Sequence, residues 1–256
     1  MNLAVLVLAA GKGTRMESDL PKVLHPLLGR PLVAHVLDAA QKLHPTRLIC
    51  IVGHRADLVE AEVSRSHPGA EFVNQGEMLG TGHAVLQTHA ALRDFDGEII
   101  VTCGDAPLLT SETLGDLLEK RRQSDAAAAM LVGRLDEPGR YGRVVMDETG
   151  QVERIVEWKD ASDDERALET VNAGTYAFLS SELWPALERV TNANASGEYY
   201  LTDVIGLLRE GGKHVVGILV SEREMTGVNT RAELAQLERE LTEEARLMAE
   251  NEAMPS

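Results

Sequence analysis

Short apolar runs alternate with longer amphipathic stretches through the first half of the chain. The apolar runs have the length of strands and cover residues 3–9, 47–53, 71–74, 98–103 and 127–132. The amphipathic stretches have apolar positions at helical spacing and cover residues 31–43, 82–92 and 111–123. Such alternation is typical of a parallel sheet covered by helices. We therefore expect an α/β fold of the Rossmann-like, doubly wound type with a mostly parallel sheet.

The pattern changes after Gly139. Residues 143–146 and 152–158 flank the turn Glu148-Thr149-Gly150, which predicts an antiparallel hairpin inserted into the fold. Three further elements are expected, a strand over 171–179, a helix over 200–208 and a last strand over 215–220.

A capping box opens the last segment of the chain. Thr230 and Glu233 have the spacing in which each side chain caps the other's backbone N–H, and a long charged stretch of Leu and Glu follows. The sequence contains neither an internal repeat nor a low-complexity linker. We expect one continuous catalytic-type domain over 1–229, followed by an arm helix and tail over 230–256.

A glycine-rich turn directly follows the first predicted strand. It reads Leu8-Ala9-Ala10-Gly11-Lys12-Gly13-Thr14-Arg15-Met16, with Leu20-Pro21-Lys22 close behind. Such a turn exposes backbone N–H groups at the carboxyl edge of a sheet and can cradle phosphates. The dinucleotide fingerprint needs Gly or Ala where Met16 stands, and the P-loop spacing is absent as well. Arg15 and Lys22 add cationic donors that could stabilise charge during phosphoryl chemistry.

Composition narrows the class of ligand. The formal net charge is -16 and aromatic residues make up 4% of the chain, whereas nucleic-acid binding needs clustered Lys and Arg and uses stacking side chains. No nucleic-acid partner is therefore expected. Basic residues inside a glycine-rich turn of an acidic chain favour a small anionic ligand.

Other classes of site find no support in the sequence. Cys50 and Cys103 lie far apart in apolar runs, so we expect two reduced thiols rather than a disulfide or a zinc site. The histidines lack metal-binding spacing, and no Gly-x-Ser-x-Gly elbow indicates a hydrolase. The run 3–9 lacks a basic leader and is too short to span a bilayer, so we expect a cytoplasmic protein without a membrane partner.

The glycine-rich turn and the following Asp19-Leu20-Pro21-Lys22 resemble the signature of the sugar nucleotidyltransferase family. Within this family the chain is especially similar to the N-terminal halves of bacterial bifunctional N-acetylglucosamine-1-phosphate uridylyltransferases. The other pieces that carry the resemblance are Asn74-Gln75, Leu79-Gly80-Thr81-Gly82-His83-Ala84, Gly104-Asp105-Ala106-Pro107-Leu108, Tyr141-Gly142-Arg143, Ile155-Val156-Glu157, Val171-Asn172-Ala173-Gly174, Gly197-Glu198-Tyr199-Tyr200-Leu201-Thr202-Asp203 and Gly227-Val228-Asn229.

The resemblance implies a reaction in which UTP and N-acetylglucosamine 1-phosphate give UDP-N-acetylglucosamine and pyrophosphate, with Mg²⁺ as cofactor. It implies that Arg15 and Lys22 are catalytic and that Asp105 and Asn229 bind the metal. The implied nucleotide-binding residues are Leu8, Ala9, Ala10, Gly11, Gly13, Lys22, Gln75, Gly80, Thr81 and Asp105. The implied sugar-binding residues are Gly104, Gly142, Glu157, Asn172 and Asn229.

Each implied role also has a physical basis and a plainer alternative. A carboxylate after a strand, as at Asp105, can hold Mg²⁺, but such residues are often turn or cap residues. The Gln75 carboxamide can donate to and accept from a pyrimidine edge, and Thr81 can equally serve as a helix N-cap. A sugar 1-phosphate is mostly a dianion at neutral pH, so the reaction needs no catalytic base.

The sequence departs from the family pattern at two points. Relatives commonly have an aromatic residue, typically Tyr, where Cys103 stands, so the sugar is less firmly specified than the reaction. The bifunctional relatives continue into a β-helix with acetyltransferase activity, whereas this sequence ends after the arm helix. Acetyl transfer is therefore not expected, and without that trimerising β-helix we expect a monomer.

Two alternatives stay open. One is a related reaction, such as glucose 1-phosphate with UTP or dTTP, on the same fold. The other is a non-catalytic subunit that binds nucleotide sugars. The joint presence of Arg15, Lys22, Asp105 and Asn229 speaks against the second alternative, because a decayed relative should lose such groups first.

Overall fold

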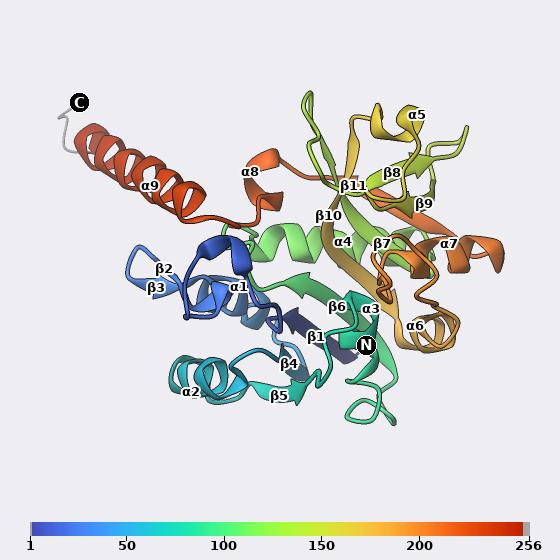
Figure 1. Ribbon diagram of the computed structural model, residues 1–256, viewed down its shortest axis with the longest axis horizontal. Coiled ribbons are helices and arrows are strands. Elements are labelled where there is room, and N and C mark those ends of the chain that lie inside the picture. The colour runs from blue at the N-terminus through green and yellow to red at the C-terminus, as the bar shows by residue number, and fades with distance from the viewer. Residues whose placement is uncertain (1, 253–256) are drawn as a thin grey trace.

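The computed structural model describes residues 2–252, and a central sheet runs through the body of the molecule (Figure 1). The strands of the main sheet are β1 Asn2–Leu8, β4 Arg47–Val52, β5 Glu71–Asn74, β6 Gly97–Cys103, β7 Ala128–Arg134, β8 Arg143–Met146, β9 Val152–Val156, β10 Thr170–Leu179 and β11 Val215–Leu219. A small separate hairpin is formed by β2 Pro26–Leu27 and β3 Arg30–Pro31.

Helices connect these strands. They are α1 Leu32–Gln41, α2 Ala56–Ser66, α3 Thr81–Leu86, α4 Ser111–Gln123, α5 Asp163–Arg166, α6 Ser180–Leu187, α7 Asp203–Glu210, α8 Glu222–Met225 and α9 Arg231–Glu252. Short 3-10 turns cover Thr14–Met16 and Lys22–Leu24. Within residues 2–252 no helix has the length and apolar character needed to cross a membrane.

The strand order of the main sheet is β11-β7-β10-β6-β1-β4-β5. Strand β1 is parallel to both β4 and β6, and β11 is parallel to β7. Strand β10 is antiparallel and lies between β6 and β7, and the hairpin β8–β9 branches from it. The carboxyl ends of β1, β4 and β6 therefore meet at one edge of the sheet, where α/β folds bind ligands.

Alternate residues of the buried strands build two cores, one on each face of the sheet. In β1, Val5 and Val7 pack with α1, α2 and α4, while Ala4 and Leu6 pack with α3, α6 and α7. This alternation follows from the two-residue period of a strand. The doubly wound α/β fold and the inserted hairpin predicted from the sequence are confirmed.

Several predicted boundaries need correction. Helix α3 ends at Leu86 rather than near residue 92, and hydrogen-bonded turns continue the chain to Phe95. Helix α7 begins at Asp203 rather than Tyr200. Helices α2 and α6 were not predicted at all, because charged residues in α2 and Pro185 in α6 obscure the helical pattern.

The arm helix α9 extends away from the body in Figure 1. Its capping box is present, since Glu233 N–H donates to the Thr230 hydroxyl at 3.1 Å and Thr230 N–H donates to the Glu233 carboxylate at 3.2 Å. Leu234 is buried with Met16 and Leu27, which attaches the first turns of the arm to the segment after the glycine-rich turn. Residues 253–256 of the predicted tail lie outside the described residues.

Candidate active site

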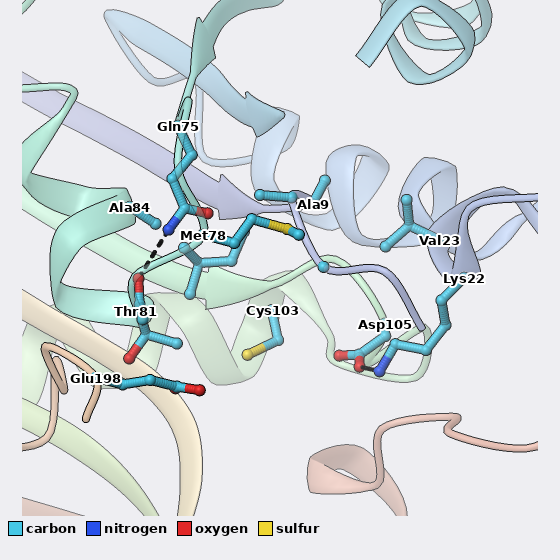
Figure 2. Close-up of a pocket in the computed structure, with 14 residues that line it drawn as sticks. Ala9, Lys22, Val23, Gln75, Met78, Thr81, Ala84, Cys103, Asp105 and Glu198 are labelled. Atoms are coloured by element: carbon cyan, nitrogen blue, oxygen red, sulfur yellow. Dashed lines mark hydrogen bonds and ion pairs between the residues drawn. The ribbon is translucent and has the colours of Figure 1, made fainter. Parts of the chain in front are cut away.

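A cavity of about 290 Å³ opens at the carboxyl edge of the sheet (Figure 2). Its walls come from the ends of β1, β5 and β6 and from the start of α3. Its lining includes every implied nucleotide-binding residue except Gly13, namely Leu8, Ala9, Ala10, Gly11, Lys22, Gln75, Gly80, Thr81 and Asp105. The fold thus gathers residues from Leu8 to Glu198 around one cavity.

The glycine-rich turn leaves the sheet at the end of β1. Ala9 N–H still donates to Ile51 at 2.8 Å, and His54 N–H donates to Ala10 at 3.1 Å. Beyond this point the turn no longer pairs with β4. Gly13 has φ +59°, and a Cβ there would lie 2.5 Å from the Lys22 Cβ. Gly13 does not line the cavity. It allows the Lys22 segment to approach the turn closely, because any other residue would place a Cβ against Lys22.

A cluster of charged and amide groups lies at the end of the cavity near Lys22. The Lys22 ammonium forms an ion pair with the Asp105 carboxylate and donates to the Asn229 Oδ1 at 3.1 Å. The Arg15 guanidinium donates to the same Asn229 oxygen at 2.8 Å. Figure 2 shows the Lys22 and Asp105 side chains pointing at one another across the cavity edge. All four residues implied in catalysis and metal binding are thus in contact.

Backbone and side-chain hydrogen bonds fix the position of Asn229. Val228 N–H donates to the Asp105 carbonyl at 2.9 Å, which ties the segment before the arm to the end of β6. Asn229 N–H donates to the Glu233 carboxylate at 2.7 Å, and its side-chain amide donates to Gly227 at 3.0 Å. The capping box therefore does more than start a helix, because its Glu233 carboxylate also fixes the backbone of Asn229.

The donor set at Asp105 and Asn229 fits Mg²⁺. Both side chains present oxygen to one point, the Lys22 ammonium, and Mg²⁺ prefers one or two protein oxygens together with waters and substrate phosphates. Among residues 2–252 no three His, Cys, Asp or Glu side chains gather in a metal-binding cluster.

Gln75 lies at the opposite end of the cavity and is 5% exposed. Its Nε2 donates to the Gly80 carbonyl at 2.9 Å, which aims the carboxamide into the lining (Figure 2). Gly80 has φ +116°, and a Cβ there would lie 2.5 Å from the Tyr199 carbonyl. Thr81 does not cap its own helix, since its hydroxyl accepts from Leu201 N–H at 3.0 Å. The alternative of Thr81 as N-cap is therefore wrong.

The implied sugar-binding residues Gly142, Glu157 and Asn172 form a second group. Asn172 N–H donates to the Gly142 carbonyl at 2.9 Å, and a Cβ on Gly142 would lie 3.5 Å from Glu157 Oε2. The Asn172 side-chain oxygen accepts from Tyr176 OH at 2.9 Å and from Gly174 N–H at 3.0 Å. These residues do not line the 290 Å³ cavity, and Glu157 lines a separate cavity of about 240 Å³.

A buried arginine holds the loop that carries Gly142. The Arg143 side chain is 1% exposed and its guanidinium donates to the carbonyls of Gly139 at 3.0 Å and Arg166 at 3.1 Å. It also lies over the Trp158 ring, 5.0 Å from the ring centroid. Burial lowers the pKa of Arg143 from its ordinary value. The guanidinium thereby fixes the backbone on which Gly142 lies.

Glu157 has an unusual electrostatic setting for a carboxylate. Burial raises its pKa above the ordinary value, and the nearby Asp203 and Asp160 carboxylates raise it further, while a hydrogen bond from the Thr202 hydroxyl at 3.0 Å opposes the shift. The fold thus holds a carboxyl group where its ionised form is disfavoured, which is a frequent property of functional sites.

Cys103 lies between the two groups of residues. It lines the cavity, and its sulfur lies 3.7 Å from the Gly174 carbonyl, next to the Asn172 turn. Burial raises the pKa of this thiol to about 12, with a smaller contribution from Asp105, so it is a neutral wall residue at neutral pH. The neighbouring Gly104 N–H continues the sheet by donating to Leu8 at 2.9 Å. Both cysteines are free, as predicted.

Some lining residues were not identified from the sequence. They are Val23, Met78, Ala84 and Glu198. Glu198 and Ala84 belong to motifs that were noted without a role, and Val23 directly follows Lys22. Met78 carries no motif signal, because it lies one residue before the Leu79-Gly80-Thr81 run and reaches the cavity only through the turn of the loop.

Comparison with curated proteins finds relatives among bacterial enzymes. The chain is 44% identical to the bifunctional protein GlmU of Oceanobacillus iheyensis over 239 residues, covering 93% of this chain and 52% of the relative. It is also 44% identical to a bifunctional protein GlmU of Bacillus cereus, covering 93% of this chain and 51% of the relative. The chain therefore spans about half the length of the curated relatives it matches.

Comparison with solved structures supports the fold. The structure of UDP-glucose pyrophosphorylase complexed with UDP-glucose superposes with a TM-score of 0.75 at 15% identity, covering 95% of this chain and all of the other. A putative glucose-1-phosphate thymidylyltransferase from Bacillus anthracis superposes with a TM-score of 0.72 at 19% identity, covering 93% and 94%. At these identities the likeness concerns the fold alone.

The family described as the MobA-like NTP transferase domain matches residues 5–207, which is most of the chain and includes the glycine-rich turn, Gln75 and Asp105. This agrees with the resemblance seen in the sequence motifs. The chain therefore belongs to the MobA-like NTP transferase domain family and is an enzyme of the nucleotidyltransferase class.

Proposed function

We propose that this enzyme transfers the uridylyl group of UTP to N-acetylglucosamine 1-phosphate, giving UDP-N-acetylglucosamine and pyrophosphate in a Mg²⁺-dependent reaction. The observation that carries the proposal is the contact of Arg15, Lys22, Asp105 and Asn229 at one end of a cavity formed by the glycine-rich turn. The GlmU relatives and the ordered motifs support the choice of a sugar 1-phosphate as acceptor.

The nucleotide would lie along the cavity. Its base would face Gln75 and the Gly80 backbone, and its phosphates would lie along the turn Ala9 to Gly11 toward Lys22. Backbone N–H groups of a turn at a sheet edge bind phosphate oxygens well. Asp105 and Asn229 would hold Mg²⁺, which when bound neutralises phosphate charge. Arg15 and Lys22 add fixed positive charge where charge increases in the transition state.

The acceptor would approach from the side of Gly142, Glu157 and Asn172. Its phosphate is mostly a dianion at neutral pH and already nucleophilic, so no residue has to remove a proton from it. The phosphate oxygen attacks the α-phosphorus of UTP in line, and the bond to the β-phosphate breaks as pyrophosphate leaves. The chain's contribution is alignment of two anions and neutralisation of their repulsion.

A substrate panel tests the proposal. UTP, dTTP and other triphosphates are paired with N-acetylglucosamine 1-phosphate and glucose 1-phosphate, and pyrophosphate release is measured with Mg²⁺ and with a chelator. We expect the fastest release with UTP and the N-acetylated sugar, and almost none with the chelator. Faster release with glucose 1-phosphate would contradict the choice of sugar, and undiminished release with the chelator would contradict the metal assignment.

A further inference from the structure

Two adjacent apolar side chains are exposed on the loop between β5 and α3. Met78 is 38% exposed and Leu79 is 36% exposed. Only Met78 of the two lines the 290 Å³ cavity. Exposing a large apolar side chain inside a ligand cavity is unfavourable in water, and covering it by a ligand relieves this cost.

The backbone of this loop is fixed at both ends. Gly76 N–H donates to the Asn74 side chain at 2.8 Å, and the Leu79 carbonyl accepts from Tyr199 N–H at 2.7 Å. Gly76 and Gly80 take positive φ values of 70° and 116°, so the chain turns sharply on either side of Met78. The anchored loop therefore presents the Met78 side chain to the cavity without depending on a bound ligand.

Figure 2 shows the Met78 thioether extending from the loop into the cavity, between Gln75 and Ala9. Gln75 offers its carboxamide to the edge of a flat ring, while Ala9 and Ala84 offer small apolar surfaces. A nucleobase needs polar partners at its edge and apolar partners at its faces. A thioether is flexible and polarisable, and it packs well on aromatic rings.

We propose that Met78 packs on the face of the nucleotide's pyrimidine ring and contributes to nucleotide binding. The inference rests on the proposed function, because it takes the cavity as the nucleotide site. It adds a residue to which neither the sequence motifs nor the contacts of the charged cluster assign a role. The packing affects nucleotide binding and leaves the acceptor sugar untouched.

Paired variants test this assignment by steady-state kinetics. Met78→Ala removes the thioether, and we expect the KM for UTP to rise about 10-fold while kcat and the KM for the sugar phosphate change less than about 2-fold. Met78→Leu should restore most of the affinity. Leu79→Ala is the matched control, because it removes a side chain of similar exposure from the same loop outside the cavity, and it should leave both KM values unchanged.

A second measurement needs no turnover. Peroxide converts exposed methionine to the sulfoxide, and UTP or dTTP at saturating concentration should slow oxidation of Met78 at least about 5-fold if the ring covers it. Met248 on α9 is 66% exposed and serves as the internal reference, whose oxidation rate should not change. Mass spectrometry of peptides reports both rates in one sample.

The outcomes separate the two proposals. Protection of Met78 by a triphosphate without formation of a nucleotide sugar would overturn the proposed function and keep the inference. Turnover of UTP with Met78 unprotected, or with Met78→Ala no different from Leu79→Ala, would overturn the inference and keep the proposed function. If neither UTP nor dTTP slows the oxidation of Met78, the inference is also overturned.

Discussion

Two carboxylates, one at the start of strand β6 and one just after its end, are each paired with cations. The two clusters differ in how deeply they are buried and in what their cations contact. At the start of β6, Glu98 is fully buried and receives Arg121 at 2.8 Å and Arg122 at 2.9 Å. Just beyond its end, Asp105 is 18% exposed and pairs with Lys22, which is 17% exposed. The first cluster buries its carboxylate and one of its two arginines, with Arg122 at the surface, whereas the second borders a cavity.

The Glu98 cluster is complete without a ligand. Arg121 is 4% exposed, and its Nη1 donates to the Ala126 carbonyl at 2.9 Å, so these partners of the guanidinium lie inside the protein. At the other end of β6, the Lys22 ammonium pairs with the Asp105 carboxylate and also donates to the Asn229 side-chain oxygen. The Arg15 guanidinium donates to the same Asn229 oxygen. Two cations thus converge on oxygens for which a metal ion can compete, and a phosphate can compete for the cations themselves. Removing one partner of a buried, fully hydrogen-bonded ion pair destabilises the fold. Cations that border a cavity can instead stabilise charge on a bound ligand.

The largest expected effect is on turnover, at Asp105. Asp105→Asn keeps the shape of the side chain but removes the charge that would hold Mg²⁺ opposite Asn229. We expect a loss of about 10³-fold in kcat, equivalent to about 4 kcal/mol. Pyrophosphate release measures it, and circular dichroism with thermal melting should show a retained fold, because this pair lies near solvent. An unimpaired rate would refute the metal assignment.

At Glu98 we expect a loss of stability without a loss of turnover. Glu98→Gln leaves two guanidinium groups without their counter-charge, one of them buried, and we expect a loss of about 3 kcal/mol in the free energy of unfolding. Denaturant unfolding measures this loss, and kcat at a temperature where the variant is folded should match the parent. If kcat fell while stability held, the division between the two ends of β6 would be wrong.

A substitution at Gly13 tests whether turnover depends on the position of Lys22 in the cluster with Asp105. In Gly13→Ala the new Cβ would meet the Lys22 Cβ at 2.5 Å, and φ +59° strains any side chain, so Lys22 must shift. We expect kcat to fall about 10²-fold, since small displacements of catalytic groups are costly. Gly150→Ala is the control, because φ is +80° there but nothing lies within 4 Å of the added Cβ. It should cost stability alone, as measured by melting.

The smallest effect is expected at Glu157. Its folded-state pKa is raised, so the unfolded chain loses the proton first as pH rises, and stability falls between the ordinary pKa and the raised one. Glu157→Gln removes that loss. We expect its melting temperature to exceed the parent's by a few degrees (about 3 °C) at pH 7.5 and to equal it near pH 4.

The same variant should bind the acceptor more weakly. If Glu157 accepts hydrogen bonds from the sugar, Glu157→Gln should raise the KM for the sugar phosphate about 10-fold and leave the KM for UTP unchanged. A gain in stability together with a loss in affinity is typical of a functional site. An equal melting difference at both pH values would contradict the electrostatic explanation.

The part of the cavity formed by the glycine-rich turn and Asp105 was largely predictable from the sequence. The glycine-rich turn after β1 and Asp105 after β6 follow parallel strands, and carboxyl ends of parallel strands meet at one edge. The fold was predictable for the same reason, since alternation of strands and helices determines the sheet. The antiparallel position of β10 between β6 and β7 was not predicted, because strand order depends on long-range pairing.

The group formed by Gly142, Glu157 and Asn172 was singled out only through the family resemblance. Glu157 and Asn172 are isolated polar residues and Gly142 is an isolated glycine, so no spacing rule links the three. Their contacts depend on the bulge of β10 near Asn172 and on the buried Arg143. Met78 was missed altogether, because no local pattern shows which side of a loop will face a cavity. The raised pKa of Glu157 likewise depends on burial and on charges brought close only by folding.

The insertion of β10 between β6 and β7 has a consequence during synthesis on the ribosome. Strand β6 is complete once Cys103 has been made, but its neighbour starts only at Thr170. Until then the growing chain presents an open row of backbone N–H and C=O groups along a highly apolar strand, which is a template for wrong pairing. The edge of β6 that later pairs with β10 therefore lacks its partner for as long as residues 104–169 are being translated.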